Sequence, residues 1–303
     1  MRFLAIALVV IACGGGGKRA KTSKPDPLPE PKTITDKIVH LLPHGAQIVV
    51  EIDLARLRGN AVIGETLTKA LAAPMNMPSD LPTPPLAAAD AVVFASYGIG
   101  TSNAATIAVI ATTKDVPDAT RISTGADIGI WAMGPSEWVR QLEARAALSL
   151  GKTPVIAPPE LLRLRERSMP EKAPGASLRV TARLPFDARV ALAKDSGLES
   201  APAQISIWAD VVDDFVIVID ADAVDPGEKA TKKSTARLEK LIRHALRSVA
   251  EEPKMRALGL SSSISRARLA AGGSWIRTII AVGPAHLRRV IERANTFLAG
   301  GSS

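Results

Sequence analysis

Apolar and polar residues alternate in several short segments of this 303-residue chain. In Gln47–Asp53, Ile48, Val50 and Ile52 share one face, which is the period of a β-strand. Similar runs joined by short turns predict antiparallel hairpins. The remaining predicted strands are Ala91–Tyr97 with Thr106–Thr112, Arg121–Thr124 with Ile128–Met133, Leu178–Leu184, Gln204–Trp208 with Phe215–Ile219, and Ile264–Ala270 with Trp275–Val282.

Other segments have apolar residues three and four positions apart, the spacing of a helix that buries one face. Predicted helices are Thr35–Leu42 capped by Thr35, Leu54–Ala72, Glu160–Arg167, Glu228–Ala250, and two segments opened by Pro135 and Pro284. Hairpins interspersed with helices predict the α+β class.

Proline-rich stretches divide the chain. We expect a first α+β half at 34–150, a connector at 151–175 and a second α+β half at 176–303.

Ile130–Ala146 and Ile279–Asn295 align without a gap, and both run from a strand through Gly-Pro into a helix. Six of the seventeen aligned positions are identical: Ile130/Ile279, Ala132/Ala281, Gly134/Gly283, Pro135/Pro284, Arg140/Arg289 and Glu143/Glu292.

This match predicts two duplicated halves, each built of antiparallel hairpins with covering helices. The helices opened by Pro135 and Pro284 should then play equivalent roles. The glycine before each proline should supply unusual backbone angles for a tight turn.

The first residues have the pattern of a secretory signal. A positive start at Arg2 is followed by an apolar run, Phe3–Ala12, and then by Cys13. The run is shorter than the about 20 apolar residues that a membrane-spanning helix needs. We therefore expect residues 1–12 to be a cleaved signal peptide.

Val10-Ile11-Ala12-Cys13 resembles the lipobox of bacterial lipoproteins. The resemblance covers about thirteen residues and implies that Cys13 receives a diacylglyceryl thioether and that the new N-terminus is acylated. Two or more chains matter because one acyl chain gives only marginal membrane binding. In a cell with two membranes, Gly14 after the cysteine implies placement at the outer membrane. An ordinary secretory signal is the alternative.

Residues 13–33 are expected to form the anchor and a flexible linker, since four glycines, basic residues and spaced prolines follow Cys13. A coil of about 20 residues spans roughly 25 Å on average. The folded part should therefore sit close to a membrane.

The composition fits an exported, folded protein. Apolar residues make up 47% of the chain, the net charge is +8 and the pI about 9.8. Cys13 is the only cysteine, so the chain has no internal disulfide. Export argues against nucleic acid as the basic partner, which leaves anionic lipid or an anionic polymer of the envelope.

Two segments partly match nucleotide-binding motifs but lack a glycine that each motif requires. Leu150–Thr153 ends like a phosphate loop, but Ala146 stands where the first glycine is needed. Gly98 and Gly100 begin a dinucleotide fingerprint in which Asn103 replaces the third glycine and a strand follows instead of a helix. We expect no nucleotide cofactor.

Metal and catalytic motifs are similarly incomplete. The acidic run around Asp220 fails the calcium-loop spacing, because Asp225 occupies the glycine position. Pro43 separates His40 from His44 and prevents a helical zinc pair. No GxSxG elbow is present, although a triad assembled from distant positions is still an alternative. The expectation is no metal, no cofactor and no catalytic residues.

Three further features allow an ordinary structural interpretation. Glu51 and Asp53 share a strand face, where a carboxylate pair competes with a solvated face on which Asp53 caps the next helix. The basic helix around 229–249 is either an ordinary solvated face over a packed stripe or a patch for anionic lipid or envelope polymer. The tryptophans are expected in the core or at its edge: Trp131, Trp138, Trp208 and Trp275.

Together these observations predict a lipid-anchored protein of the cell envelope that acts as a non-enzymatic binding or structural module. One alternative is an accessory subunit of an envelope transport or assembly machine, which would show an exposed apolar patch with a polar rim. The other is a hydrolase with a distant triad, which would show polar side chains converging in one deep pocket.

Overall fold

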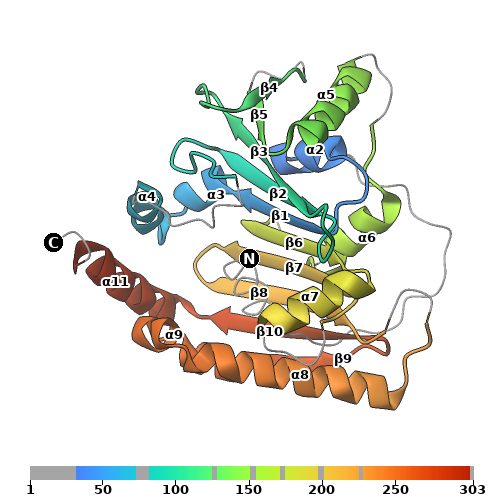
Figure 1. The fold of residues 1–303 in the computed structure, drawn as a ribbon. Helices are drawn as coiled ribbons and strands as arrows, with labels where there is room; N and C mark the ends of the chain where they lie inside the picture. The colour runs from blue at the N-terminus through green and yellow to red at the C-terminus, as the bar shows by residue number, and fades with distance from the viewer. Residues whose placement is uncertain are drawn as a thin grey trace.

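The fold is built on one large antiparallel sheet. The computed structural model describes residues 32–72, 82–124, 128–150, 155–170, 175–196, 201–224 and 228–300. Within these ranges ten strands pair in the order β4-β5-β3-β2-β1-β6-β7-β8-β10-β9 (Figure 1). The class is therefore α+β, as predicted. The strands are β1 Ile48–Asp53, β2 Ala91–Tyr97, β3 Ala105–Thr112, β4 Thr120–Ile122, β5 Gly129–Met133, β6 Leu178–Arg183, β7 Gln204–Val211, β8 Phe215–Asp222, β9 Arg268–Ala271 and β10 Trp275–Val282.

The two halves of the chain meet at the centre of this sheet. β1 pairs antiparallel with β6, with Val50 opposite Val180. Because side chains alternate along a strand, Ile48, Val50 and Ile52 point to one side of the sheet and Val49 and Glu51 to the other.

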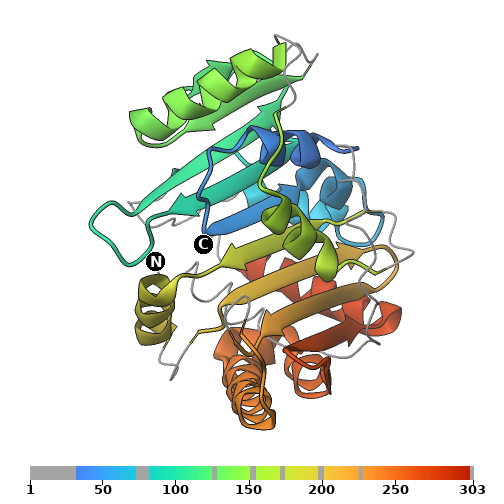
Figure 2. The same cartoon turned by 90° about the vertical axis from the view of Figure 1, so that its right-hand side faces the viewer.

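The side that carries Val49 and Glu51 is called here the α6 face. It is covered by α2 (Ile34–Leu41), α5 (Ser136–Leu150) and α6 (Pro159–Arg167), whose apolar side chains form one cluster with the strands of the first half. In the second view, α6 lies in front of the central strands (Figure 2).

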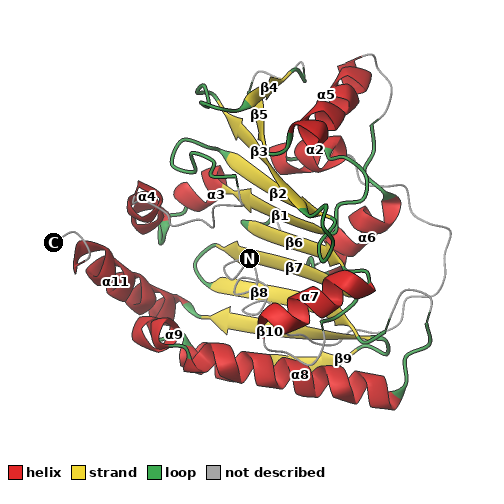
Figure 3. Cartoon of the chain, viewed as in Figure 1, coloured by secondary structure: helices red, strands yellow, loops and turns green. Residues whose placement is uncertain are grey.

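The opposite side is called the α8 face. Over the first half it packs against α3 (Leu54–Arg58) and α4 (Gly64–Ala72), and over the second half against α7 (Phe186–Ser196) and α8 (Lys232–Glu251). The remaining helices are α9 (Pro253–Leu258), α10 (Ser261–Ser265) and α11 (Pro284–Gly300). Figure 3 shows α8 running along the end of the molecule that carries β9 and β10.

The predicted strands and hairpins are largely confirmed, but several helix boundaries were wrong. Thr33, not Thr35, caps α2, because its side chain accepts the N–H of Asp36 while the Asp36 carboxylate accepts the N–H of Thr33. The expected helix Leu54–Ala72 is broken into α3 and α4. Ile264 belongs to α10 and not to a strand, and α7 was not predicted.

The break between α3 and α4 has a clear cause. Asn60 donates from its side-chain amide to the carbonyl oxygens of Val211 and Val212 at 3.0 and 2.9 Å. Its side-chain oxygen accepts the N–H of Val62 at 2.8 Å. Asn60 thus bonds the turn between α3 and α4 to the β7–β8 hairpin, and this tertiary contact overrides the local helical pattern.

The two halves share a strand order but not every helix position. Counted outward from the centre, the sequence β1-β2-β3-β5-β4 mirrors β6-β7-β8-β10-β9. However, α5 packs on the α6 face, whereas α11 packs through Leu287 against Val282 and Leu57 on the α8 face. The expected equivalence of the helices opened by Pro135 and Pro284 is therefore wrong.

The two Gly-Pro steps also differ. Gly134 has a φ of +137°, and a Cβ there would lie 2.9 Å from the carbonyl oxygen of Thr106, so this position requires glycine. Gly283 has no positive φ, and a Cβ added there would meet nothing within 4 Å. The prediction of unusual backbone angles holds only for the first step.

No helix in the described part of the chain is long and apolar enough to cross a membrane.

Candidate functional site

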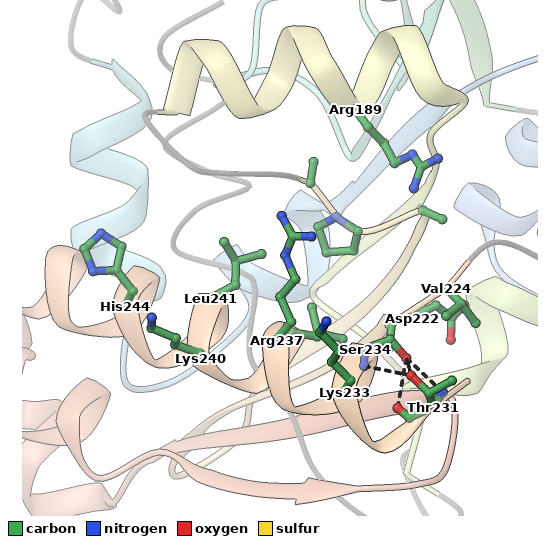
Figure 4. Close-up of a pocket in the computed structure, with 15 residues that line it drawn as sticks. Arg189, Asp222, Val224, Thr231, Lys233, Ser234, Arg237, Lys240, Leu241 and His244 are labelled. Carbon is green, nitrogen blue, oxygen red and sulfur yellow. Dashed lines mark hydrogen bonds between the residues drawn. The ribbon is translucent and has the colours of Figure 1, made fainter. Parts of the chain in front are cut away.

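A pocket of about 730 Å³ lies between α7 and α8 on the α8 face (Figure 4). α8 contributes one wall and Arg189 of α7 the other, while the segments that flank β7 and β8 complete it. The lining side chains are Arg189, Ala201, Pro202, Ala203, Asp222, Ala223, Val224, Thr231, Lys233, Ser234, Arg237, Leu238, Lys240, Leu241 and His244.

α8 is positioned by a cap and a buried apolar stripe. Thr231 accepts the N–H of Ser234 and forms a capping box with it, which fixes the first turn. The buried side chains of the helix pack on the sheet: Leu238, Ile242, Ala245, Leu246, Val249 and Ala250. The helix expected around 229–249 is thus present, but it begins at Lys232, and it packs an apolar stripe on the sheet beneath a basic face.

The basic face of α8 points into the pocket. Lys233, Arg237, Lys240 and His244 follow the spacing i, i+4, i+7 and i+11, which places them in one row. This row extends over about 16 Å at 1.5 Å per residue. Arg237 rises from α8 toward α7, from which Arg189 descends (Figure 4). The described lining therefore brings four Lys and Arg side chains around one cavity.

α7 is held in place by burial of its inner side. Ala188 and Leu192 belong to the same apolar cluster as the α8 stripe. The loop after β2 approaches the start of α7 so closely that a Cβ at Gly100 would lie 2.7 Å from the carbonyl oxygen of Asp187. The pocket wall is thus fixed by the sheet on one side and by this loop on the other.

One carboxylate lines the pocket, and an arginine outside it already holds that group. Asp222 accepts two hydrogen bonds from Arg167 at 3.0 and 2.9 Å. Burial raises the pKa of the Asp222 carboxyl; Asp220 also raises it, while Arg167 acts in the opposite direction. The balance of the described lining is therefore strongly cationic.

Beneath α6 the structure holds a second group of charges, buried and paired. Arg165 donates to both oxygens of Glu51, at 2.6 and 2.7 Å, and also contacts Asp36 and Glu166. Only 6% of the Arg165 side chain and 3% of Glu51 are exposed. Burial alone would raise the pKa of Asp36, but Arg165 and the hydrogen bonds from Thr33 lower it.

The same face carries two further ion pairs. Arg277 donates to both oxygens of Asp220 at 2.9 and 3.0 Å, and Asp220 is fully buried. Arg56 of α3 donates to both oxygens of Asp210, which also accepts from Ser177. Every acid in these pairs is matched by an arginine, so we assign this network to holding α6 and α3 onto the sheet rather than to a ligand.

The carboxylates singled out from the sequence are separated by this arrangement. Glu51 is buried against Arg165, so the expected solvated face was wrong at that residue. Asp53 accepts the N–H of Arg56 and caps α3, as predicted. The two do not act as a carboxylate pair.

The four histidines occupy separate environments. His40 is buried in α2, and His44 lies 2.8 Å from the Arg145 guanidinium. His244 lies at the pocket and His286 in α11. Among the residues that the structure describes, no group of three or more His, Cys, Asp or Glu side chains could hold a metal ion.

One serine–histidine contact can be compared with a catalytic pair. Ser263 Oγ lies 3.1 Å from His286 Nδ1, and His286 Nε2 lies 2.8 Å from the carbonyl oxygen of Gly259. The group that orients the imidazole is thus a backbone carbonyl and not a carboxylate. Neither residue lines the α7–α8 pocket.

The tryptophans take core or half-core positions, as predicted. Trp208 is buried, and Trp138 stacks on the buried ring of Tyr97 with the ring centres 3.9 Å apart. Burial raises the pKa of Tyr97 well above its ordinary range. Cys13 and residues 14–31 of the linker expected at 13–33 lie outside the described residues, whereas Thr33 belongs to the cap of α2. Pro74 to Leu81 of the expected proline-rich loop and Asp225 also lie outside the described residues.

Comparisons with known proteins give a weak likeness to solved structures. No protein-family model matches this chain, and no curated protein matches it. Crystal form III of the protein TP0453 is similar with a TM-score of 0.42 and 8% identity, over 85% of this chain and 97% of the other. Crystal form I of the same protein gives 0.41 and 8%, over 84% and 96%. These values are too low to assign a function.

Proposed function

We propose that this chain is a lipid-anchored, non-enzymatic protein of the cell envelope whose folded part binds an anionic ligand in the α7–α8 pocket. The anchor is supported by the signal-like start and by Cys13. In a cell with two membranes, Gly14 supports the outer one. The binding role is supported by a single observation, the cavity of about 730 Å³ with its cationic lining.

The charges of this pocket differ from those elsewhere in the protein. Arg165 and Arg277 are matched by buried acids, and Arg167 pairs with the partly buried Asp222 of the pocket lining. Among the described residues, no ion pair holds Lys233 or Lys240, and both are exposed. Unmatched cations around a concavity attract anions, and the apolar side chains Leu238 and Leu241 add a surface for the nonpolar part of a ligand.

Catalysis in this pocket finds less support. Ser234 and His244 are ten residues apart on one helix, which separates them by about 15 Å along its axis. The Ser234 hydroxyl donates to the carbonyl oxygen of Thr231 at 2.9 Å. A hydrolase needs its nucleophile and base within hydrogen-bonding distance, and Ser234 and His244, the serine and histidine of the described lining, do not form such a pair.

An accessory subunit of an envelope machine is the second candidate, supported by apolar side chains at the end of α5 and just after it. Leu148, Leu150 and Ile156 are 53%, 48% and 46% exposed. Exposed apolar side chains of this size mark contact surfaces when they gather. A partner captured by the native protein and lost on Leu148→Glu would favour this candidate.

We also propose that the halves arose by duplication, in a form that permits later displacement of helices. The shared strand order supports it. The common positions of α2 and α6, each before the central strand of its half, support it as well. The opposite placement of α5 and α11 weighs against a strict repeat.

The binding proposal is tested by calorimetric titration with glycerol phosphate at low salt. Lys233→Gln with Lys240→Gln removes two charges from the pocket, and Lys232→Gln with Arg247→Gln removes the same charge from exposed positions of α8 outside the lining. We expect the first pair to weaken binding at least about tenfold, as for lost charge-assisted contacts, and the second to have little effect. Equal affinity of both pairs, or no binding by the unaltered protein, would show the proposal to be wrong.

A further inference from the structure

α7 exposes large apolar side chains next to the basic pocket. Phe186 is 68% exposed and Val190 is 52% exposed. The two are four residues apart, so they lie side by side on the outer surface of the helix. Ala188 and Leu192 already bury the inner surface, which means that burial in the fold does not explain Phe186 or Val190.

Cationic groups flank this apolar pair. The Arg189 guanidinium lies 5.9 Å from the centre of the Phe186 ring. Lys194 follows on the exposed side of α7, and the row that begins at Lys233 lies across the pocket on α8. Apolar side chains bordered by lysine and arginine are the pattern of helices that bind at the surface of a bilayer.

We infer that α7 and the basic row of α8 together form a surface that docks on a bilayer rich in anionic phospholipid. Phe186 and Val190 enter the interfacial layer, and the pocket receives a phosphate headgroup. This inference rests on the proposed anion-binding pocket and adds its ligand class. The docking gives the protein a second membrane contact, in addition to the anchor proposed at Cys13.

A bilayer fits these observations better than a free polyanion does. A polymer of phosphate or carboxylate groups would use the cations but leave Phe186 and Val190 in water. A bilayer offers both phosphate groups and an apolar layer. Each Lys or Arg close to such a surface adds roughly a fivefold increase in affinity, and the described pocket lining alone provides four.

The experiment labels α7 with an environment-sensitive fluorophore. Cys13 is the only cysteine, and a lipidated sulfur does not react with thiol reagents, so Val190→Cys supplies a single labelling site in the lipidated protein. The full mature chain is reconstituted through its lipid into vesicles of phosphatidylcholine with an increasing fraction of phosphatidylglycerol. Ala144→Cys, on α5, is the control position.

We expect the emission at position 190 to rise and shift to shorter wavelength as the phosphatidylglycerol fraction increases, while the label at position 144 stays unchanged. Adding Lys233→Gln and Lys240→Gln should abolish the response at the fraction that saturates the parent. A label at position 190 that stays in water on all vesicles would overturn the docking.

The failures of the two proposals can be told apart. If glycerol phosphate binds in the pocket but position 190 stays in water, the pocket is correct and the docking is wrong. If soluble polyphosphate binds and competes with glycerol phosphate without any change at position 190, the ligand is a free polyanion and the docking is again wrong. If neither anion binds and position 190 stays in water, both proposals are wrong.

Discussion

At the scale of single residues, Arg165 is a charged side chain that lies almost entirely in the protein interior. Its guanidinium contacts Glu51, Asp36 and Glu166 while being almost fully buried. Burial would lower its pKa, but Glu51 and Asp36 raise it instead. The side chain therefore stays charged, and its contribution to the fold lies in pairing with the buried carboxylate of Glu51 and the partly buried carboxylate of Asp36.

Replacing this residue by Arg165→Met should destabilise the protein by about 3–5 kcal/mol, because Glu51 would lose the guanidinium that pairs with it in the interior, while Asp36 would keep its contacts with the N–H of Thr33 and with Arg179. Arg163→Met, on the exposed side of α6, removes the same charge and should cost less than about 0.5 kcal/mol. Urea denaturation of both variants measures the difference. Equal stabilities would show that the network is not structural.

The stability difference between Arg165→Met and the parent should depend on pH. In the unaltered protein the pKa of Asp36 is lowered, so the stability from its ionised form is present above its ordinary pKa and lost as the pH falls through the lowered value. Without Arg165 the pKa of Asp36 is lowered less, because only the hydrogen bonds from Thr33 and the more distant Arg179 then oppose burial. The stability gap between variant and parent should therefore narrow as the pH falls below about 4, where the parent loses the contribution of ionised Asp36.

At the scale of elements, α5 depends on a narrow buried stripe. Val139, Leu142 and Ala146 are buried against the sheet, and Leu142 has no exposed surface. Leu142→Ala should cost about 2–5 kcal/mol through lost contact and a residual cavity. Leu148→Ala, at a half-exposed position on the same helix, should stay within about 0.5 kcal/mol of the parent. Thermal unfolding of the two variants compares them, and similar melting temperatures would contradict the assigned packing.

The sequence predicted elements best where one face of the element is buried. α8 separates its buried row from its lysines and arginines, so its pattern was clear. β1 was also found, because its apolar and acidic residues alternate, but both of its faces are covered and Glu51 is buried. α7 was missed because its apolar residues lie on both sides: Ala188 and Leu192 inward, Phe186 and Val190 outward. Such a distribution has no single helical stripe.

Only one part of the candidate site could be predicted from the sequence. The basic row on α8 is a local pattern along one helix. The pocket, in contrast, needs α7, the segment before β7 and the end of β8 to meet that row, and these are separated along the chain. Likewise, Arg165 and Glu51 are 114 residues apart, and only the fold shows that this pair is buried.

At the scale of the whole molecule, two groups of charges are distinguished from the other surface charges by their surroundings. One is internal, where arginines of α3, α6 and β10 are matched by buried acids. The other surrounds the α7–α8 pocket, where the described lysines and arginines outnumber the single carboxylate. The net charge of +8 thus has a local counterpart in one concave, partly apolar surface.

A tether of about 20 residues would hold this surface within reach of a membrane. The anchor, the linker and the basic pocket therefore support one another only if Cys13 is the lipidated N-terminus of the mature protein. This is the central claim for the molecule as a whole, since the membrane gives both the location and the proposed ligand.

Intact-mass spectrometry of the native protein extracted in detergent tests this claim most directly. We predict a chain that begins at Cys13 and carries the added mass of a diacylglyceryl group, with a further acyl group where the new N-terminus is modified. Cys13→Ser should remove that mass and release the protein from the membrane fraction. A mature chain that begins at another residue, or an unmodified Cys13, would contradict the account.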